Sequence, residues 1–224
     1  LDLDNKILRH VSPAFAEDPL RVFRVARFAA LLTDFSIAEE TMALMSTMSK
    51  SGELQTLSAE RVWQELSKAL AGANAKRFFA VLAQCHALTH WLPELIKVWP
   101  QSTNAGASAA QCFAHLPLVE SEYLSLAERL RVPNSFLQLA LDRCQHLQHL
   151  VNFRALSAVS LYTCFASLQA LHSDERLVAL LDLLPDPEQR VELIAQLPPL
   201  AEGLKTVTLS DAEKLGLQGR AFGE

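Results

Sequence analysis

The chain has 224 residues, half of them hydrophobic, and a formal net charge of −5, a composition that supports a folded core and argues against a disordered chain. No uninterrupted apolar run reaches the roughly 18–20 residues that span a bilayer, and no basic and apolar leader opens the sequence, so we expect a cytoplasmic protein. The acidic balance excludes a protein that coats nucleic acid through bulk positive charge.

The first part of the chain is expected to consist of helices. Apolar residues recur at spacings of three and four almost throughout, which predicts an all-α fold. The first helix is predicted over residues 18–32, with Asp18 as its cap and proline at the first helical position. A Ser-x-x-Glu capping box opens a second predicted helix over 36–50. Ser58 and Asn74 are in position to cap the two helices that follow.

A change of composition marks a boundary near the middle of the chain. Residues 100–110, PQSTNAGASAA, are small and polar and have no periodicity, which is typical of a linker. We therefore divide the chain into a region 1–100 and a region 101–224. Shorter helices are predicted in the second region near residues 111–131, 134–152, 157–172, 174–184, 187–197 and 209–219.

The charged residues are unevenly distributed between the two parts. Residues 1–80 contain ten Lys and Arg against ten Asp and Glu, whereas residues 81–224 contain ten against fifteen. The whole acidic excess therefore lies in the second part. A site for a polyanion is expected to be local and to lie in the first part.

The first predicted helix carries Arg21, Arg24 and Arg27 at every third position. At about 100° per residue these arginines share one half of the helix with Val25 and Phe28. One interpretation is a set of surface arginines whose stems cover apolar surface. The other is the wall of a cleft that binds a triphosphate, because Arg pairs bidentately with phosphate and stays charged when half buried.

Asp18 adds a hydrogen-bond acceptor beside the donors of Arg21, and this pair can read the edge of a flat base. Cytosine and adenine present an amino group where uracil and guanine present a carbonyl. A carboxylate accepts from the amino group and repels the carbonyl, while the arginine donates to a ring nitrogen or oxygen. Each such contact provides about 1–3 kcal/mol of discrimination. The pair would accept C and A and reject U and G.

Three stretches resemble one family. LDLDNKILRHVSPAFAEDPLRVFRVARFAALLTDFSIAEETM, residues 1–42, resembles the neck of the bacterial class II tRNA nucleotidyltransferases, the CCA-adding enzymes. Within it, EDPLR matches the family's EDxxR motif, the amino-acid template for CTP and ATP. LSAERVWQELSKAL, residues 57–70, resembles the next neck motif, whose helix braces the template helix. RFFAVLAQCHALTHWLPEL, residues 77–95, is similar to the segment that follows.

The resemblance implies a function for each matching residue. Asp18 and Arg21 would read the base of CTP or ATP, and Arg24 and Arg27 would be further nucleotide-binding residues. We assign supporting roles beside them to Glu17, Glu60 and Arg61.

The resemblance also implies an all-α array of neck, body and tail, with the body and tail contacting tRNA. The family's catalytic α/β head, with the aspartates that hold Mg²⁺, has no counterpart in this sequence. We therefore expect no catalytic residue here and an inactive chain by itself. In the whole protein, this part would select the base and bind the tRNA 3′ end and acceptor arm while CCA is added.

The second region contains two groups of residues that bear on metal binding. Related enzymes carry a phosphohydrolase domain that needs an adjacent His-Asp pair, and this sequence has none. We therefore expect no intact site of that type and interpret His115 as structural. Cys144, His146 and His149 lie within six residues, but Leu147 and Leu150 are their neighbours, which favours partly buried histidines over a metal site.

Two alternatives remain open. A bacterial poly(A) polymerase of the same superfamily shares the neck motifs, although nothing here is basic enough for general RNA binding. A non-catalytic RNA-binding module could also have kept the neck fold. A polymerase should neglect CTP, and a module should transfer no nucleotide.

Overall fold

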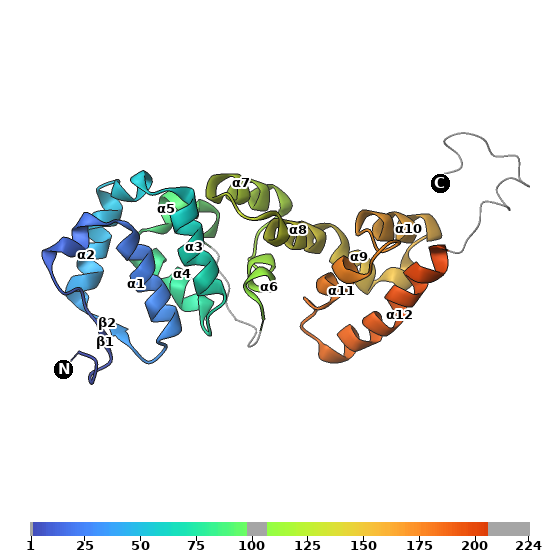
Figure 1. The fold of residues 1–224 in the computed structure, drawn as a ribbon, viewed down its shortest axis with the longest axis horizontal. Helices are drawn as coiled ribbons and strands as arrows, with labels where there is room; N and C mark the ends of the chain where they lie inside the picture. Colours follow the sequence, from blue (N-terminus) through green and yellow to red (C-terminus); the bar gives the residue numbers. More distant parts are fainter. Residues whose placement is uncertain (1, 98–106, 206–224) are drawn as a thin grey trace, which may run out of the picture. The chain divides into compact units, whose positions relative to one another are not determined.

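The computed structural model describes residues 2–97 and 107–205, and this part of the chain is almost entirely helical (Figure 1). The predicted all-α fold is confirmed. The chain divides into two compact units, Leu1–Ala140 and Leu141–Glu224. Most of the expected linker and the helix predicted over 209–219 lie outside the described residues. Over those that are described, no helix is both long and apolar enough to cross a membrane.

The first unit opens with a short strand pair. β1 (Ile7–Leu8) pairs in parallel with β2 (Ser36–Ile37), and the Ser36 N–H donates to the carbonyl of Lys6 over 2.8 Å. The predicted capping box at Ser36 is therefore wrong. This residue belongs to a strand, because its backbone is paired with a segment 30 positions earlier.

Four helices form the core of the first unit. α1 (Leu20–Leu31) packs against α3 (Ala59–Leu70) and α4 (Ala75–Gln84), and α2 (Glu39–Lys50) follows β2. The inner face of α1 is fully buried. It consists of Val22, Phe23, Ala26, Ala29 and Ala30. Small alanines let α1 approach its neighbours closely, which positions its first turn relative to α3.

Both predicted caps of α3 and α4 are confirmed. Ser58 Oγ accepts from the Arg61 N–H over 3.4 Å, and Asn74 Oδ1 accepts from the Arg77 N–H over 3.2 Å. Each cap satisfies a backbone donor that has no partner within its helix. The Arg77 guanidinium also donates to the carbonyl of Thr33 over 2.6 Å, which ties the end of α1 to α4.

The first unit continues past residue 100. α5 (Leu88–Trp91), α6 (Ala109–Ala114) and α7 (Glu120–Leu130) pack on it, followed by α8 (Asn134–Asp142). The ring of Trp63 on α3 meets the rings of Phe113 and Phe136 edge-on, with centroids 5.6 and 5.0 Å away. The compact unit thus ends 40 residues after the boundary suggested by composition.

The prediction of a single helix over 111–131 is wrong, because this segment forms two helices, α6 and α7. Pro117 lies in the gap between them. The hydroxyl of the buried Tyr123 lies 2.8 Å from the carbonyl oxygens of Ala114 and Leu116. Its single proton can be donated to one of these carbonyls at the end of α6, which gives a physical reason for the break.

The second unit starts within a continuous helical stretch. A π-helical turn (Arg143–Leu147) joins α8 to α9 (Gln148–Val151). A 3₁₀ turn (Phe153–Ala155), α10 (Ala158–Ser167), α11 (Glu175–Leu181) and α12 (Pro187–Lys205) follow. α12 extends beyond the predicted 187–197. The nearly buried Asp142 accepts from Arg176 Nη2 over 2.7 Å, an ion pair within this unit.

Candidate nucleotide-reading site

Asp18 lies directly before the first turn of α1. Pro19 occupies the cap position of the helix, one residue later than predicted. Asp18 Oδ1 nevertheless accepts from the Leu20 N–H over 3.2 Å, and its backbone carbonyl accepts from the Arg21 N–H over 3.0 Å. The positive end of the helix dipole favours a carboxylate at this place.

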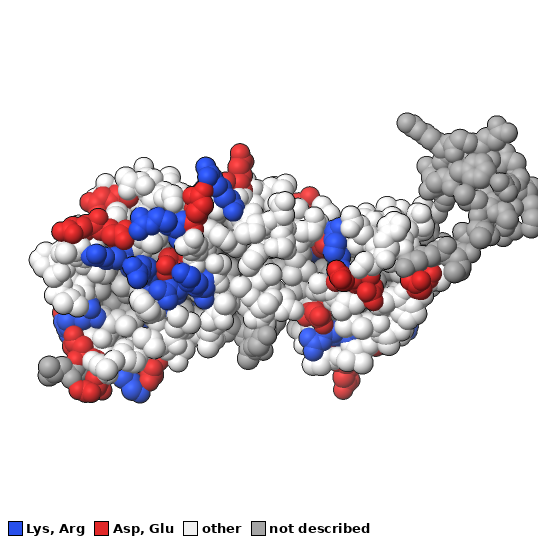
Figure 2. Space-filling view, viewed as in Figure 1, with Lys and Arg blue, Asp and Glu red and all other residues white. Residues whose placement is uncertain are grey.

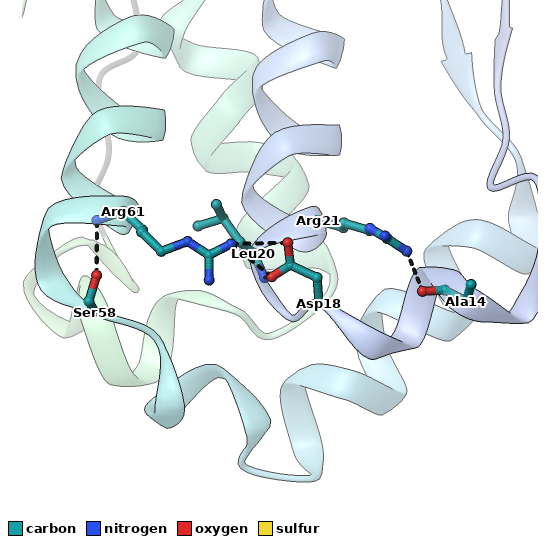
Figure 3. A network of polar contacts seen from close by, with 6 residues as sticks. All are labelled: Ala14, Asp18, Leu20, Arg21, Ser58 and Arg61. Atoms are coloured by element: carbon teal, nitrogen blue, oxygen red, sulfur yellow. Dashed lines mark hydrogen bonds and ion pairs between the residues drawn. The ribbon is translucent and has the colours of Figure 1, made fainter.

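The carboxylate of Asp18 is held by an arginine from a different helix. Arg61 Nη2 lies 3.1 Å from Asp18 Oδ1 and 3.0 Å from Asp18 Oδ2 (Figure 3). Arg61 lies in the first turn of α3, and the Ser58 cap stabilises this turn. The side chains of Arg61 and Asp18 are 48% and 29% exposed, so the pair stays accessible from solvent.

Arg21 points away from Asp18. Its Nη1 donates to the carbonyl of Ala14 in the 3₁₀ turn (Pro13–Glu17) that precedes the helix (Figure 3). On this side Arg21 lines a cavity of about 360 Å³ between the segment after β1 and α1. The cavity is lined by Leu8, Arg9, His10, Val11, Ser12, Phe15, Arg21, Val25 and Phe28. Asp18 and Arg21 are therefore neighbours on the helix, but their side chains diverge.

The other two arginines of α1 have contrasting environments. Arg24 is exposed, and among the residues that the structure describes its side chain has no hydrogen bond or ion pair. Arg27 is largely buried, and its Nε donates to Glu65 Oε2 on α3 over 2.5 Å. Its guanidinium carbon also lies 4.2 Å from the centre of the Phe28 ring. The structure thus gives Arg27 a place in the interface between α1 and α3, and only Arg24 is open to a ligand.

The remaining supporting residues lie on the surface around this site. Glu17 is exposed at the end of the 3₁₀ turn. Glu60 pairs with Arg131. Its own backbone N–H, in the first turn of α3, lowers the pKa of its carboxyl, and Arg131 lowers it further. The carboxylates of Glu17 and Glu60 form no ion pair with Arg21.

Basic side chains gather over α1 and α3 on one face of the first unit (Figure 2). A local basic patch is therefore present in a chain that is acidic as a whole. Acidic side chains lie beside this patch, and two of them, Asp18 and Glu60, form ion pairs with arginines.

The group around Cys144 is on the second unit. His146 belongs to the π-helical turn and His149 to α9, and both line a cavity of about 350 Å³ that also includes Cys164. In the part of the chain that is described, no three His, Cys, Asp or Glu side chains are arranged to hold a metal ion.

Sequence reasoning missed the contact between Arg61 and Asp18 and the burial of Arg27. The two partners of each pair are separated by 43 and 38 positions along the chain. One signal was available, because the motif around Arg61 resembles a helix that braces the template helix. It did not indicate which side chains meet.

Known proteins are similar to this chain in sequence and in fold. Residues 34–98 match a family model described as the probable RNA- and SrmB-binding site of polymerase A. The CCA-adding enzyme of Coxiella burnetii (strain RSA 331 / Henzerling II) is 35% identical over 242 residues, which covers 99% of this chain and 61% of that protein.

Solved structures of CCA-adding enzymes have the same fold. One in complex with ATP matches with a TM-score of 0.62 at 18% identity, over 99% of this chain and 58% of that one. The Thermotoga maritima enzyme in complex with tRNA matches with a TM-score of 0.57 at 17% identity, over the same shares. This chain is thus similar over nearly its whole length to CCA-adding enzymes, shares their helical fold, and spans about three fifths of the length of these relatives.

Proposed function

We propose that this chain is the base-selecting and tRNA-binding part of an enzyme that adds CCA to the tRNA 3′ end from CTP and ATP. In this proposal, region 1–100 reads the nucleotide and region 101–224 contacts tRNA as body and tail. The observation that carries it is a solvent-accessible carboxylate, Asp18, that Arg61 holds directly before the first turn of α1, with Arg21 three residues further along. The names of the relatives support the same reaction.

Base selection would depend on Asp18 and Arg21. Asp18 would accept from the amino group of cytosine or adenine and repel the carbonyl of uracil or guanine. Arg21 would leave the carbonyl of Ala14 and donate to the ring of the base. Asp18 and Arg21 would therefore act together only when a base is bound. Arginine's long side chain allows this swing without movement of the helix.

The other arginines would have separate functions. Arg24 would bind the triphosphate, because it is exposed and has a charge that no described carboxylate neutralises. Arg27 would act indirectly: its ion pair with Glu65 holds α1 against α3 and so fixes the position of Asp18.

The acceptor arm and 3′ end of tRNA would approach the basic face over α1 and α3. Local positive charge is the general means by which proteins hold a phosphate backbone. The matched RNA-binding model includes α3, which supports this placement.

Nucleotidyl transfer by this family implies Mg²⁺. The described residues do not fit such a site, because no suitable group of carboxylates is present among them. We assign no step of the reaction to a metal held here, and the ion would bind elsewhere in the whole protein.

The test is nucleotide incorporation by the complete gene product on a tRNA that lacks its terminal CCA. We expect addition of C, C and A, and rejection of UTP and GTP. A protein that incorporates only A in long runs would be a poly(A) polymerase, the alternative that the matched polymerase model favours. A protein that binds tRNA and transfers nothing would be a binding module.

A further inference from the structure

We infer that Arg61 is a positioning residue for base selection, because it fixes the carboxylate of Asp18 and decides which oxygen atom faces the incoming base. This inference rests on the proposed function. It concerns a contact between two helices, separate from the arginines of α1 itself.

The first step concerns the hydrogen-bonding capacity of Asp18. An ionised carboxylate has two oxygens with about four acceptor sites in total. Oδ1 accepts from the Leu20 N–H and from Arg61, at 3.2 and 3.1 Å. Oδ2 accepts from Arg61 alone among the described partners, at 3.0 Å. The open acceptor position is therefore on Oδ2.

The second step concerns rigidity. The backbone donor at Leu20 belongs to α1 and Arg61 belongs to α3, so two separate elements hold the carboxylate plane. The cap at Ser58 and the buried pair of Arg27 with Glu65 keep those two helices in register. Without Arg61, the carboxylate would keep one hydrogen bond and could rotate about its χ2 angle. Either carboxylate oxygen of Asp18 could then face the incoming base, and in many orientations.

The third step concerns what a base requires. Cytosine and adenine are distinguished from uracil and guanine by the direction of one hydrogen bond. A freely rotating carboxylate, or one approached by water, rejects a carbonyl less strongly than a fixed one. Arg61 should therefore affect discrimination between bases more than the affinity for triphosphate.

The variants Arg61→Ala and Arg61→Lys of the complete gene product test this inference. The measurement is kcat/KM for CTP, UTP, ATP and GTP on a tRNA without its CCA end. For R61A we expect the preference for CTP over UTP and for ATP over GTP to fall by about tenfold. R61K should recover most of the preference, because a single nitrogen atom of Arg61 makes both contacts.

Lys68→Gln is the matched control. Lys68 is exposed on the same helix, two turns further along, and its removal changes the charge by the same amount without touching Asp18. K68Q should keep the wild-type preference between bases, whatever its effect on the binding of tRNA to the basic face of α3. If R61A lowers the rate with all four nucleotides equally, Arg61 is only structural and the inference is wrong. If the wild-type protein adds neither C nor A, the proposed function itself fails.

Discussion

In the proposed function, base selection depends on Asp18, and a substitution at this residue can test that role. In Asp18→Asn the side chain keeps its size and an oxygen for the Leu20 N–H, but its amide group can turn a donor toward a carbonyl. We expect the preference for CTP over UTP in the complete gene product to fall by about tenfold or more. The ratio of kcat/KM values measures this, and an unchanged ratio would show that Asp18 does not select the base.

Arg24 differs from Asp18 because its proposed ligand is the triphosphate, which is the same in every nucleotide. Arg24→Ala should raise KM for CTP and ATP by a similar factor and leave the preference between bases unchanged. Steady-state kinetics with all four nucleotides provide the measurement. Lys68→Gln again controls for the loss of one surface charge. Equal KM values in R24A and the wild-type protein would contradict the assignment.

At the scale of elements, the interface between α1 and α3 contains the buried pair of Arg27 and Glu65, whose side chains are 12% and 7% exposed. Such a pair is a poor source of net stability, yet removal of one partner leaves an uncompensated charge. A large loss of stability on removal of Glu65 would therefore indicate that Arg27 has a structural role, whereas direct binding of nucleotide by Arg27 predicts a small loss.

The prediction for this pair concerns folding. Glu65→Ala should lower the free energy of unfolding by about 3–5 kcal/mol, because the Arg27 charge stays largely buried without a partner. The double variant R27L/E65L should be more stable than E65A. Urea unfolding of this chain measures both values. A loss below about 0.5 kcal/mol in E65A would mean that Arg27 is hydrated and open to a ligand after all.

At the scale of the whole molecule, each compact unit buries a thiol. Desolvation raises the pKa of Cys85 in the first unit and of Cys164 in the second from 9.0 to about 11. In the unfolded chain these thiols ionise near their ordinary pKa. Their burial therefore stabilises the protein fully below about pH 9 and progressively less as the pH rises toward 11.

We expect the free energy of unfolding to fall between pH 9 and pH 11, by on the order of 2 kcal/mol for each thiol. The matched variant C85A/C164A will be less stable at every pH, because alanine leaves space in the core. Its decline over this pH range should be shallower, since the two titrating groups are gone. Parallel curves for the two proteins would show that other groups cause the decline.

The sequence predicted much of the local structure because helix signals are carried by neighbouring residues. Ser58 and Asn74 cap the helices that were expected, and α1 ends where its periodicity ends. Arg21 lies in the first turn of the expected helix, and Asp18, which was predicted as its cap, lies one residue before the cap position. Their role in base selection remains a prediction.

Long-range contacts decided the rest. Ser36 forms a strand because Lys6 is beside it, and α6 ends where the Tyr123 hydroxyl meets its last carbonyls. Asp18 faces Arg61 rather than Arg21, although 43 positions separate them. The amino-acid sequence by itself thus determined the helical class and named candidate residues for base selection. Only the tertiary structure decided which side chains are held and which are open, since that depends on the packing of α1 against α3.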